Sequence, residues 1–160
     1  MAADKSEREA AQRVIADNRK AFHDYHVIDT WEAGVALLGT EVKAIREGRV
    51  NLRDSYARVD RGEVWLMNVH ISAYSHTGYA FHETQRQRKL LLHTDEIRKM
   101  TGQVALKGLT LVPLQMYFKK GRVKVALALV KGKQEHDKRE TIRKREVDRE
   151  TRAAVKERSR

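Results

Sequence analysis

The chain has 160 residues, 41% of them hydrophobic, and a formal net charge of +11, which together predict one modest core and a polyanionic partner, nucleic acid before an anionic membrane. The absence of cysteine excludes disulfides, thiolate metal sites and a cysteine nucleophile. No apolar run is long enough to span a bilayer and the first residues lack the pattern of an export signal, so we expect a cytoplasmic protein without a membrane partner.

Composition divides the chain into three predicted parts. Residues 1–17 form a charged, alanine-containing lead-in, in which we expect a short helix with Val14 and Ile15 as its only docking side chains. Residues 18–131 hold all the aromatic and almost all the long aliphatic side chains, and they form the predicted domain. Residues 132–160 form a basic tail without aromatic rings or proline.

The domain opens with a predicted strand and helix. The stretch YHVIDTWEAGVALL, residues 25–38, is rich in β-branched and aromatic side chains and predicts a long curved strand, with Gly34 at a bulge or tight bend. Residues 39–49 have Thr40 at a cap position, apolar side chains at near-helical spacing and Gly48 as a stop signal, which together predict a short helix.

The middle of the domain alternates strand patterns with a polar loop. Two β-rich runs in residues 54–71 flank Asp60-Arg61-Gly62 and predict a hairpin with a turn that contains glycine. Residues 74–89 have no periodicity and many polar groups, so we expect a long exposed loop, which in compact domains is often functional. The stretch KLLLH, residues 89–93, predicts a short buried strand.

The last elements of the domain have clear boundaries. Thr94 caps a predicted helix that reaches Gly102. Residues 108–132 predict two strands around Lys120-Gly121, and Pro113 indicates a strand edge or a bulge. In the second of these strands four apolar side chains share one face: Val123, Val125, Leu127 and Leu129.

These elements predict a mainly β fold. We expect a small closed or nearly closed antiparallel barrel, OB-like, of about six strands, with two or three short helices and a flexible C-terminal tail. Small barrels of this kind bind oligonucleotides, which agrees with the charge.

The seven histidines do not form a catalytic or metal-binding pattern. His23 and His26 are three residues apart, and on a strand this spacing places them on opposite faces. The sequence contains no glycine-rich phosphate loop, no G-x-S-x-G motif and no paired-carboxylate arrangement. We therefore expect a protein that is not an enzyme, with no catalytic residues, no metal and no other cofactor.

Basic residues are more informative because they gather at several places. Any one cluster could be a solvated face, whereas several on one small barrel favour nucleic acid. Nearby rings could stack on unpaired bases, and for the remaining aromatics core packing is the better interpretation. The clusters are Arg19-Lys20, Arg46 with Arg49 and Arg53, Arg86 with Arg88 and Lys89, and Lys119, Lys120, Arg122, Lys124, Lys131 and Lys133. The candidate stacking rings are Phe22, His23, Tyr79, Phe81 and His82, and the candidate core rings are Tyr25, Trp31, Trp65 and Tyr117.

Glu32 and the tail each allow two interpretations. Glu32 could be a solvent-facing strand residue without a role, or on a basic surface it could orient an arginine or accept from a base edge or a 2′-hydroxyl. The tail is too poor in aliphatic side chains to fold on its own core, yet from Asp137 it consists largely of good helix formers. It could therefore be disordered when free and fold as a helix against a phosphate-rich groove.

Four stretches in this order and spacing resemble the SsrA-binding protein (SmpB) family of bacterial trans-translation: NRKAFHDY, WEAGVALLGTEVKAIREGRVNLRDSY, RKLLLH and KGKQEHDKR. The resemblance covers about residues 18 to 140. It implies a non-enzymatic RNA-binding adaptor that binds the tRNA-like domain of transfer-messenger RNA (tmRNA). It also implies that elongation factor Tu with GTP takes part in delivering the complex to stalled ribosomes.

The resemblance further implies two sets of functional residues. The barrel would replace the missing anticodon arm, and the tail would enter the vacant mRNA channel of the small subunit and fold there as a helix. The implied RNA-binding residues are Asn18, Arg19, Lys20, Glu32, Lys89, Leu91 and Lys124. The implied decoding-centre residues of the tail are Gly132, His136, Asp137, Lys138 and Arg139.

Two other functions remain open from the residues alone. A general oligonucleotide-binding barrel, such as a ribosomal protein or an RNA chaperone, fits the composition equally well. A phosphodiester-cleaving enzyme that uses His23 and His26 belongs to a different class, and intact RNA after incubation with the protein would dismiss it.

Overall fold

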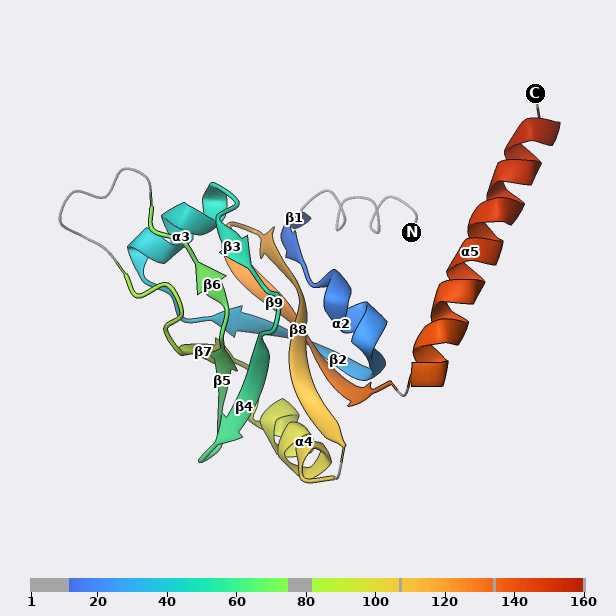
Figure 1. The fold of residues 1–160 in the computed structure, drawn as a ribbon. Helices are drawn as coiled ribbons and strands as arrows, with labels where there is room; N and C mark the ends of the chain where they lie inside the picture. Colours follow the sequence, from blue (N-terminus) through green and yellow to red (C-terminus); the bar gives the residue numbers. More distant parts are fainter. Residues whose placement is uncertain (1–11, 75–81, 107, 134, 160) are drawn as a thin grey trace, which may run out of the picture.

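The computed structural model describes residues 12–74, 82–106, 108–133 and 135–159, with only the backbone for residues 135–137. Nine strands and four helices lie within these ranges (Figure 1). In chain order they are β1 (Gln12–Asp17), α2 (Arg19–Asp24), β2 (Tyr25–Val35), α3 (Gly39–Arg46), β3 (Val50–Asn51), β4 (Tyr56–Asp60), β5 (Glu63–Met67), β6 (His70–Ile71), β7 (Arg88–Leu91), α4 (Thr94–Val104), β8 (Leu109–Lys119), β9 (Arg122–Gly132) and α5 (Glu135–Arg158).

Six of these strands form a closed ring of antiparallel pairings. Their order is β8-β4-β5-β7-β2-β9, and the pairing of β9 with β8 closes the ring. β1 pairs with residues 115–119 of β8, whereas β4 pairs with β8 at Leu111. The predicted mainly β fold of about six closed antiparallel strands with short helices is confirmed.

The larger hydrophobic core cluster fills the inside of the ring. The four apolar side chains of β9 that the sequence predicts on one face all belong to this cluster. Val125, Leu127 and Leu129 are fully buried and Val123 nearly so. Pro113 lies in β8 next to a shift of register against β9, so the predicted bulge at this proline is confirmed.

Both predicted hairpin turns adopt the left-handed geometry that suits the twist of paired strands. Arg61 and Gly62 have φ of 50° and 75°, and Lys120 and Gly121 have the same pair of values. Positive φ at both central residues marks a type I′ turn, in which glycine is unstrained.

The N-terminal helix prediction is wrong for the described part of that segment. Gln12–Asp17 forms β1, whose backbone pairs with the end of β8, from Gln12 opposite Lys119 to Asp17 opposite Gln115. Alanine and glutamate favour a helix locally, but pairing with an available strand edge outweighs this weak preference. Residues 1–11 lie outside the described residues.

Two smaller predictions about β2 and the helix starts are also wrong. The bulge in β2 lies between Val27 and Asp29, whereas Gly34 is in regular register. The N-cap of α3 is Leu38, two residues before the predicted Thr40, and the N-cap of α4 is His93, one residue before the predicted Thr94. The Glu41 carboxylate accepts a hydrogen bond from the Leu38 amide at 2.8 Å, so α3 is capped from its first turn.

The predicted exposed loop of residues 74–89 is wrong at its second half, because two of its polar side chains are buried. His82 is bonded to the Thr40 hydroxyl at 3.0 Å and to the Ile71 carbonyl at 2.9 Å. Arg88 is completely buried on β7. Residues 75–81 lie outside the described residues, and with them the predicted stacking rings of Tyr79 and Phe81.

A buried ion pair explains why Arg88 leaves the surface. Its Nε donates to Glu41 Oε2 at 2.5 Å, and its other nitrogens donate to backbone carbonyls that include that of Val69 at 2.8 Å. Arg86 donates to the second oxygen of Glu41, also at 2.5 Å. Burial alone would raise the pKa of Glu41, but the hydrogen bonds from Arg86, from the Leu38 amide and from Arg88 outweigh it and lower this pKa.

The helix α5 projects away from the ring (Figure 1). From Arg139 to Ser159 every side chain except that of Thr141 is exposed. The tail therefore has the helical character that its composition predicts, without a hydrophobic face packed on the core. None of the helices in the described ranges is long and apolar enough to cross a membrane.

Candidate nucleic-acid interface

A row of four residues crosses four neighbouring strands on the outer face of the ring. Leu91 of β7 lies opposite Gly34 of β2, Gly34 opposite Lys124 of β9, and Lys124 opposite Tyr117 of β8. Cross-strand partners share one face of a sheet, and Glu32 joins them because it precedes Gly34 by two residues. Residues far apart in the chain are thus brought together by the register.

Gly34 leaves space in this row. A Cβ atom built on it would lie 3.3 Å from the Cβ of Leu91, which is tighter than an ordinary contact. Leu91 itself is 52% exposed. Because Gly34 has no side chain, the exposed Leu91 can lie close to β2 at this position, with the charged Lys124 on the other side of the glycine.

Glu32 is held in place by two partners from β8. The Tyr117 hydroxyl donates to Oε2 at 2.6 Å, and Lys119 Nζ lies 3.1 and 3.2 Å from the two carboxylate oxygens. Burial alone would raise the pKa of Glu32, but the hydrogen bonds from Tyr117 and Lys119 and the charge of Lys124 outweigh it and lower this pKa. Glu32 is thus an ionised acceptor in a fixed orientation.

These side chains border a shallow hollow of about 440 Å³, which we call the Glu32 hollow. It brings together three of the predicted RNA-binding residues, Glu32, Leu91 and Lys124, from three different strands. Its complete lining is Glu32, Leu91, Leu92, His93, Glu96 and Lys124. A carboxylate, a cation and an apolar side chain side by side can accept a hydrogen bond, neutralise a phosphate and contact a base or ribose.

Tyr117→Phe tests whether the orientation of Glu32 matters. We expect a loss of about 1 kcal/mol in stability, typical of one hydrogen bond, and a several-fold weaker RNA affinity because the carboxylate becomes mobile. The pKa of Glu32 should rise when this hydroxyl is removed, so affinity should begin to fall at a higher pH than in the wild type. Fluorescence anisotropy measured as a function of pH gives the RNA affinity and its pH dependence.

Lys119→Met is the matched comparison. Lys119 and Glu32 are both about one-third exposed, and an ion pair of this kind contributes little. Its loss should change the affinity less than the loss of the Tyr117 hydroxyl. A Tyr117→Phe variant with the wild-type affinity and pH profile would contradict a role in orienting Glu32.

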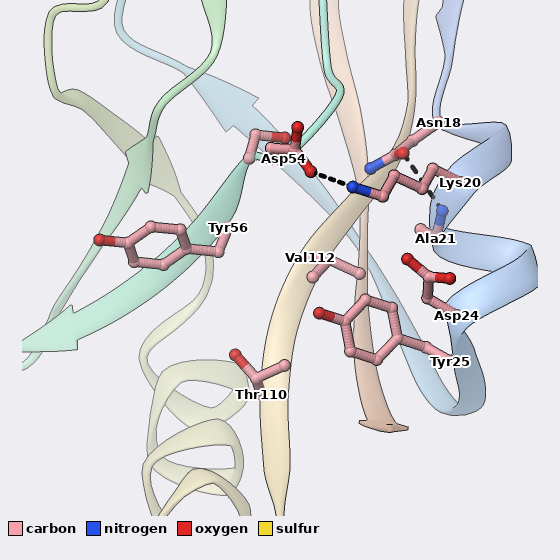
Figure 2. A pocket seen from close by; sticks show the side chains of 10 residues that line it. Asn18, Lys20, Ala21, Asp24, Tyr25, Asp54, Tyr56, Thr110 and Val112 are labelled. Atoms are coloured by element: carbon pink, nitrogen blue, oxygen red, sulfur yellow. Dashed lines mark hydrogen bonds and ion pairs between the residues drawn. The ribbon is translucent and has the colours of Figure 1, made fainter. Parts of the chain in front are cut away.

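A second hollow, of about 310 Å³, lies between α2 and the strands β4 and β8 (Figure 2). Its rim is closed by Lys20 Nζ, which lies 2.5 Å from Asp54 Oδ1. Val112 and Thr110 form the floor, and Tyr56 and Tyr25 lie on opposite sides of it in Figure 2. We call this the α2 hollow.

The α2 hollow contains two of the predicted RNA-binding residues. Asn18 is buried: its Oδ1 accepts from the Ala21 amide at 3.3 Å, and its Nδ2 donates to the Pro113 carbonyl at 2.9 Å. Asn18 thus caps α2 and fastens it to β8. Lys20 lowers the pKa of Asp54 through its hydrogen bond. Arg19, the third predicted residue of this segment, is exposed at the start of α2.

Lys89 lies apart from both hollows. It stands on β7 opposite Trp65 of β5, and its Nζ is 3.2 Å from Glu63 Oε1 in a half-exposed ion pair. The seven predicted RNA-binding residues therefore fall into one group at the Glu32 hollow, one group at α2, and Lys89.

The tail begins beside α2. Gly132 pairs with Tyr25 at the end of β9, and the next amide, that of Lys133, donates to the Asp24 carbonyl at 2.8 Å. Lys138 Nζ lies 3.5 Å from Asp24 Oδ1. The pKa of Asp24 is lowered, first by the hydrogen bond with His23 and further by Lys138.

The other predicted tail residues continue into α5. Arg139 lines a surface hollow with His23, Lys138 and Ile142. His136 and Asp137 lie in the first turn of α5, and their side chains are outside the described residues. The structure thus brings the start of the tail next to α2, which lies more than a hundred residues earlier in the chain.

Several predictions about rings have clear outcomes. Core packing is confirmed for Tyr25 and Trp31, which pack against the core clusters. Tyr117 is buried on the outer face, where its hydroxyl reaches Glu32, and Trp65 is partly exposed and is not among the described side chains packed on the core. Phe22 is 44% exposed and remains a candidate for stacking, whereas buried His82 is not one.

The placement predicted for His23 and His26 on one strand is wrong. His23 belongs to α2, where its Nδ1 lies 2.9 Å from Asp24 Oδ1, and His26 belongs to β2. The short helix α2, which begins after Asn18, was not predicted from the sequence. The Asn18 cap itself was the available signal.

Sequence reasoning also missed the partners of Glu32. Tyr117 and Lys119 are two residues apart on β8, so they share a face, but nothing local indicates that this face meets β2. The role of Gly34 was missed for the same reason, because its close contact is made with Leu91 across the sheet.

Comparisons with known proteins agree with this arrangement. The family model described as SmpB protein matches residues 15–157. An SsrA-binding protein of Trichodesmium erythraeum is 58% identical over 147 residues, which cover 91% of this chain and 94% of the relative. Another SsrA-binding protein, of Syntrophobacter fumaroxidans, is 56% identical over 138 residues, or 86% of each chain.

A solved structure carries the same fold. A chain described by the words "tmRNA-SmpB: a journey to the center of the bacterial ribosome" superposes with a TM-score of 0.65 at 47% sequence identity. The match covers 80% of this chain and 94% of the solved one. With a family model over most of its length and relatives above half identity, the chain belongs to the SmpB family.

Proposed function

We propose that this protein is an RNA-binding adaptor for trans-translation. It binds the tRNA-like domain of tmRNA and brings it, with elongation factor Tu and GTP, to the decoding centre and vacant mRNA channel of stalled bacterial ribosomes. The Glu32 hollow is the observation that supports this most strongly, because three of the predicted RNA-binding residues border one site in a chain with tmRNA-binding relatives.

The chemistry of the surface suits a folded RNA with unpaired nucleotides. Lys124 supplies charge for a phosphate, Leu91 an exposed apolar surface, and Glu32 an oriented acceptor for a base edge or a 2′-hydroxyl. Around α2, Arg19 and Lys20 add positive charge on a segment that Asn18 fixes to the ring.

The tail, residues 132–160, acts on the ribosome in this proposal. Its side chains beyond Arg139 are almost all exposed, and its charge is strongly basic, so its helix is suited to a groove of ribosomal RNA. Gly132, His136, Asp137, Lys138 and Arg139 act at the decoding centre. In the free protein the tail is disordered for much of the time, because its helix lacks a packed apolar face.

The protein works by binding rather than by catalysis, in the cytoplasm where ribosomes are. In this proposal the domain of residues 18–131 binds the RNA, and the tail of residues 132–160 acts on the ribosome. Residues 1–17 precede the domain, and β1 places part of them on the sheet.

Binding to purified tRNA-like domain tests the first step. We expect tight binding in gel shifts that weakens steeply with salt, as for any protein that neutralises several phosphates. Arbitrary duplex RNA of the same length is the matched competitor. Equal affinity for the duplex would contradict the proposal and favour a general RNA-binding barrel.

A further inference from the structure

Glu96 lines the Glu32 hollow from the first turn of α4. Neither the motifs in the sequence nor the predicted set of RNA-binding residues includes it. Its presence is unexpected, because a second carboxylate in a site for a polyanion weakens non-specific attraction. A carboxylate there needs a reason of its own.

The carboxylate of Glu96 has an unused acceptor. Its Oε2 is buried and has no hydrogen-bond partner among the described residues. A buried acceptor without a partner is unfavourable, and in native structures it commonly indicates a missing water, ion or ligand. Glu32, by comparison, has both oxygens engaged by Tyr117 and Lys119. The unpartnered carboxylate oxygen beside the hollow is therefore on α4 rather than on β2, and it meets a ligand when the Glu96 side chain turns toward the hollow.

Other groups of the hollow limit what can donate to this oxygen. Leu91 and Leu92 provide apolar contact, and Lys124 provides positive charge, a combination that suits a nucleotide whose base is not paired. Bases in a duplex already use their amino groups in pairing. An unpaired nucleotide other than uridine offers an exocyclic amino group that pairing would occupy, in addition to the ribose 2′-hydroxyl, which a duplex exposes as well.

We propose that Glu96 is a specificity-determining residue of this hollow, which accepts a hydrogen bond from an unpaired nucleotide of the bound RNA. The inference rests on the proposed function and adds a residue and a chemical requirement to it. Lys124 and neighbouring cations draw the RNA to the surface, and Glu96 selects a nucleotide that carries a donor. The net effect is lower affinity for RNA that lacks such a nucleotide.

The test uses Glu96→Gln and Asp95→Asn in the full-length chain, each removing one negative charge from the same turn. Asp95 is the matched control because its side chain is 96% exposed and does not line the hollow. If carboxylates only repelled RNA, both variants would bind more tightly. We expect Glu96→Gln to weaken binding of the tRNA-like domain about tenfold, within the range for a hydrogen bond to a charged group, and Asp95→Asn to leave it equal or slightly tighter.

Analogue interference then identifies the donor. Pools of the tRNA-like domain contain either 2′-deoxynucleotides or base analogues without the exocyclic amino group, which are inosine for guanosine, purine riboside for adenosine and pyrimidin-2-one riboside for cytidine. Each pool is separated into bound and unbound fractions. We expect one unpaired position at which an analogue impairs binding to the wild type but not to Glu96→Gln. Interference by a base analogue assigns the amino group, and deoxynucleotide interference assigns the hydroxyl.

The outcomes separate the two proposals. Wild-type protein that fails to bind the RNA would overturn the proposed function. Wild-type binding with Glu96→Gln equal or tighter would overturn only the role of Glu96, as would an interference pattern identical in both proteins. Thermal melting checks that Glu96→Gln is folded, and if it is not, the wild-type interference map still decides, since no sensitive unpaired position would exclude the requirement for a donor.

Discussion

Glu41→Gln should lower the free energy of unfolding by about 3–5 kcal/mol, the largest effect expected for a single substitution outside the RNA-binding surface. Glu41 and Arg88 are both completely buried, with 2.5 Å between Oε2 and Nε. Removing the carboxylate charge leaves the Arg88 guanidinium in the interior without the counter-charge that it contacts. Urea unfolding followed by circular dichroism measures the loss.

Two controls separate burial from charge. Glu63→Gln breaks the ion pair with Lys89, in which both side chains are nearly half-exposed, and should cost less than about 1 kcal/mol. Glu41→Met with Arg88→Met removes both buried charges and should cost less than Glu41→Gln alone. Equal losses of unfolding free energy for Glu41→Gln and Glu63→Gln would show that the buried ion pair stabilises the fold no more than the exposed one.

The same pair predicts the direction of the pH dependence. The pKa of Glu41 in the folded protein is lowered from its ordinary value of 4.5, so the unfolded chain takes up a proton at this site first. Its contribution to stability is therefore complete above that value and is lost as the pH falls through the lower, folded-state pKa. The Glu41→Gln variant should lack this part of the acid dependence.

The sequence predicted the ring well because its evidence is local. Alternation in residues 123–129, the turn pairs Arg61-Gly62 and Lys120-Gly121, and the bulge at Pro113 all depend on neighbours in the chain. Closure of the ring followed from the number of such strands. Local patterns therefore sufficed for most of the strands and for an antiparallel barrel, but not for the order of the strands in the ring.

The remaining features depend on contacts between distant residues. Arg88 meets Glu41 across 47 positions, and Tyr117 meets Glu32 across 85, so neither pair leaves a periodic signal. The polar stretch that ends at the start of β7 was therefore predicted to be an exposed loop, although Arg88 within it is buried. β1 was missed because its partner, the end of β8, lies about a hundred residues further along the chain.

The candidate site shows the same limit. Composition indicated nucleic acid, and resemblance to a family supplied Glu32, Leu91 and Lys124, but only the register of β7, β2 and β9 places them at one hollow. The charge of Glu96 suits the dipole at the first turn of α4, but this position leaves its buried oxygen unexplained.

A chain that ends at Lys133 should bind tmRNA normally and fail to support tagging. The cut preserves the pairing of Gly132 with Tyr25 and the bond from the Lys133 amide to the Asp24 carbonyl. The hydrophobic core clusters, as far as the described residues define them, contain no side chain from α5. We therefore expect a change in unfolding free energy within about 0.5 kcal/mol and RNA affinity within about twofold of the full-length protein.

A shorter chain that ends at Lys131 is the matched comparison. It loses the pairing of Gly132 with Tyr25 and the contacts of Lys133 with α2, including that of Nζ, which lies 3.3 Å from the Phe22 carbonyl, and it keeps the Asn18 cap. Binding through Arg19 and Lys20 should weaken in this chain, whereas it should not in the chain that ends at Lys133. Tagging in a reconstituted translation system is measured for both. Tagging by the chain that ends at Lys133 would contradict a ribosomal role for the tail, because the ring alone would then complete the reaction.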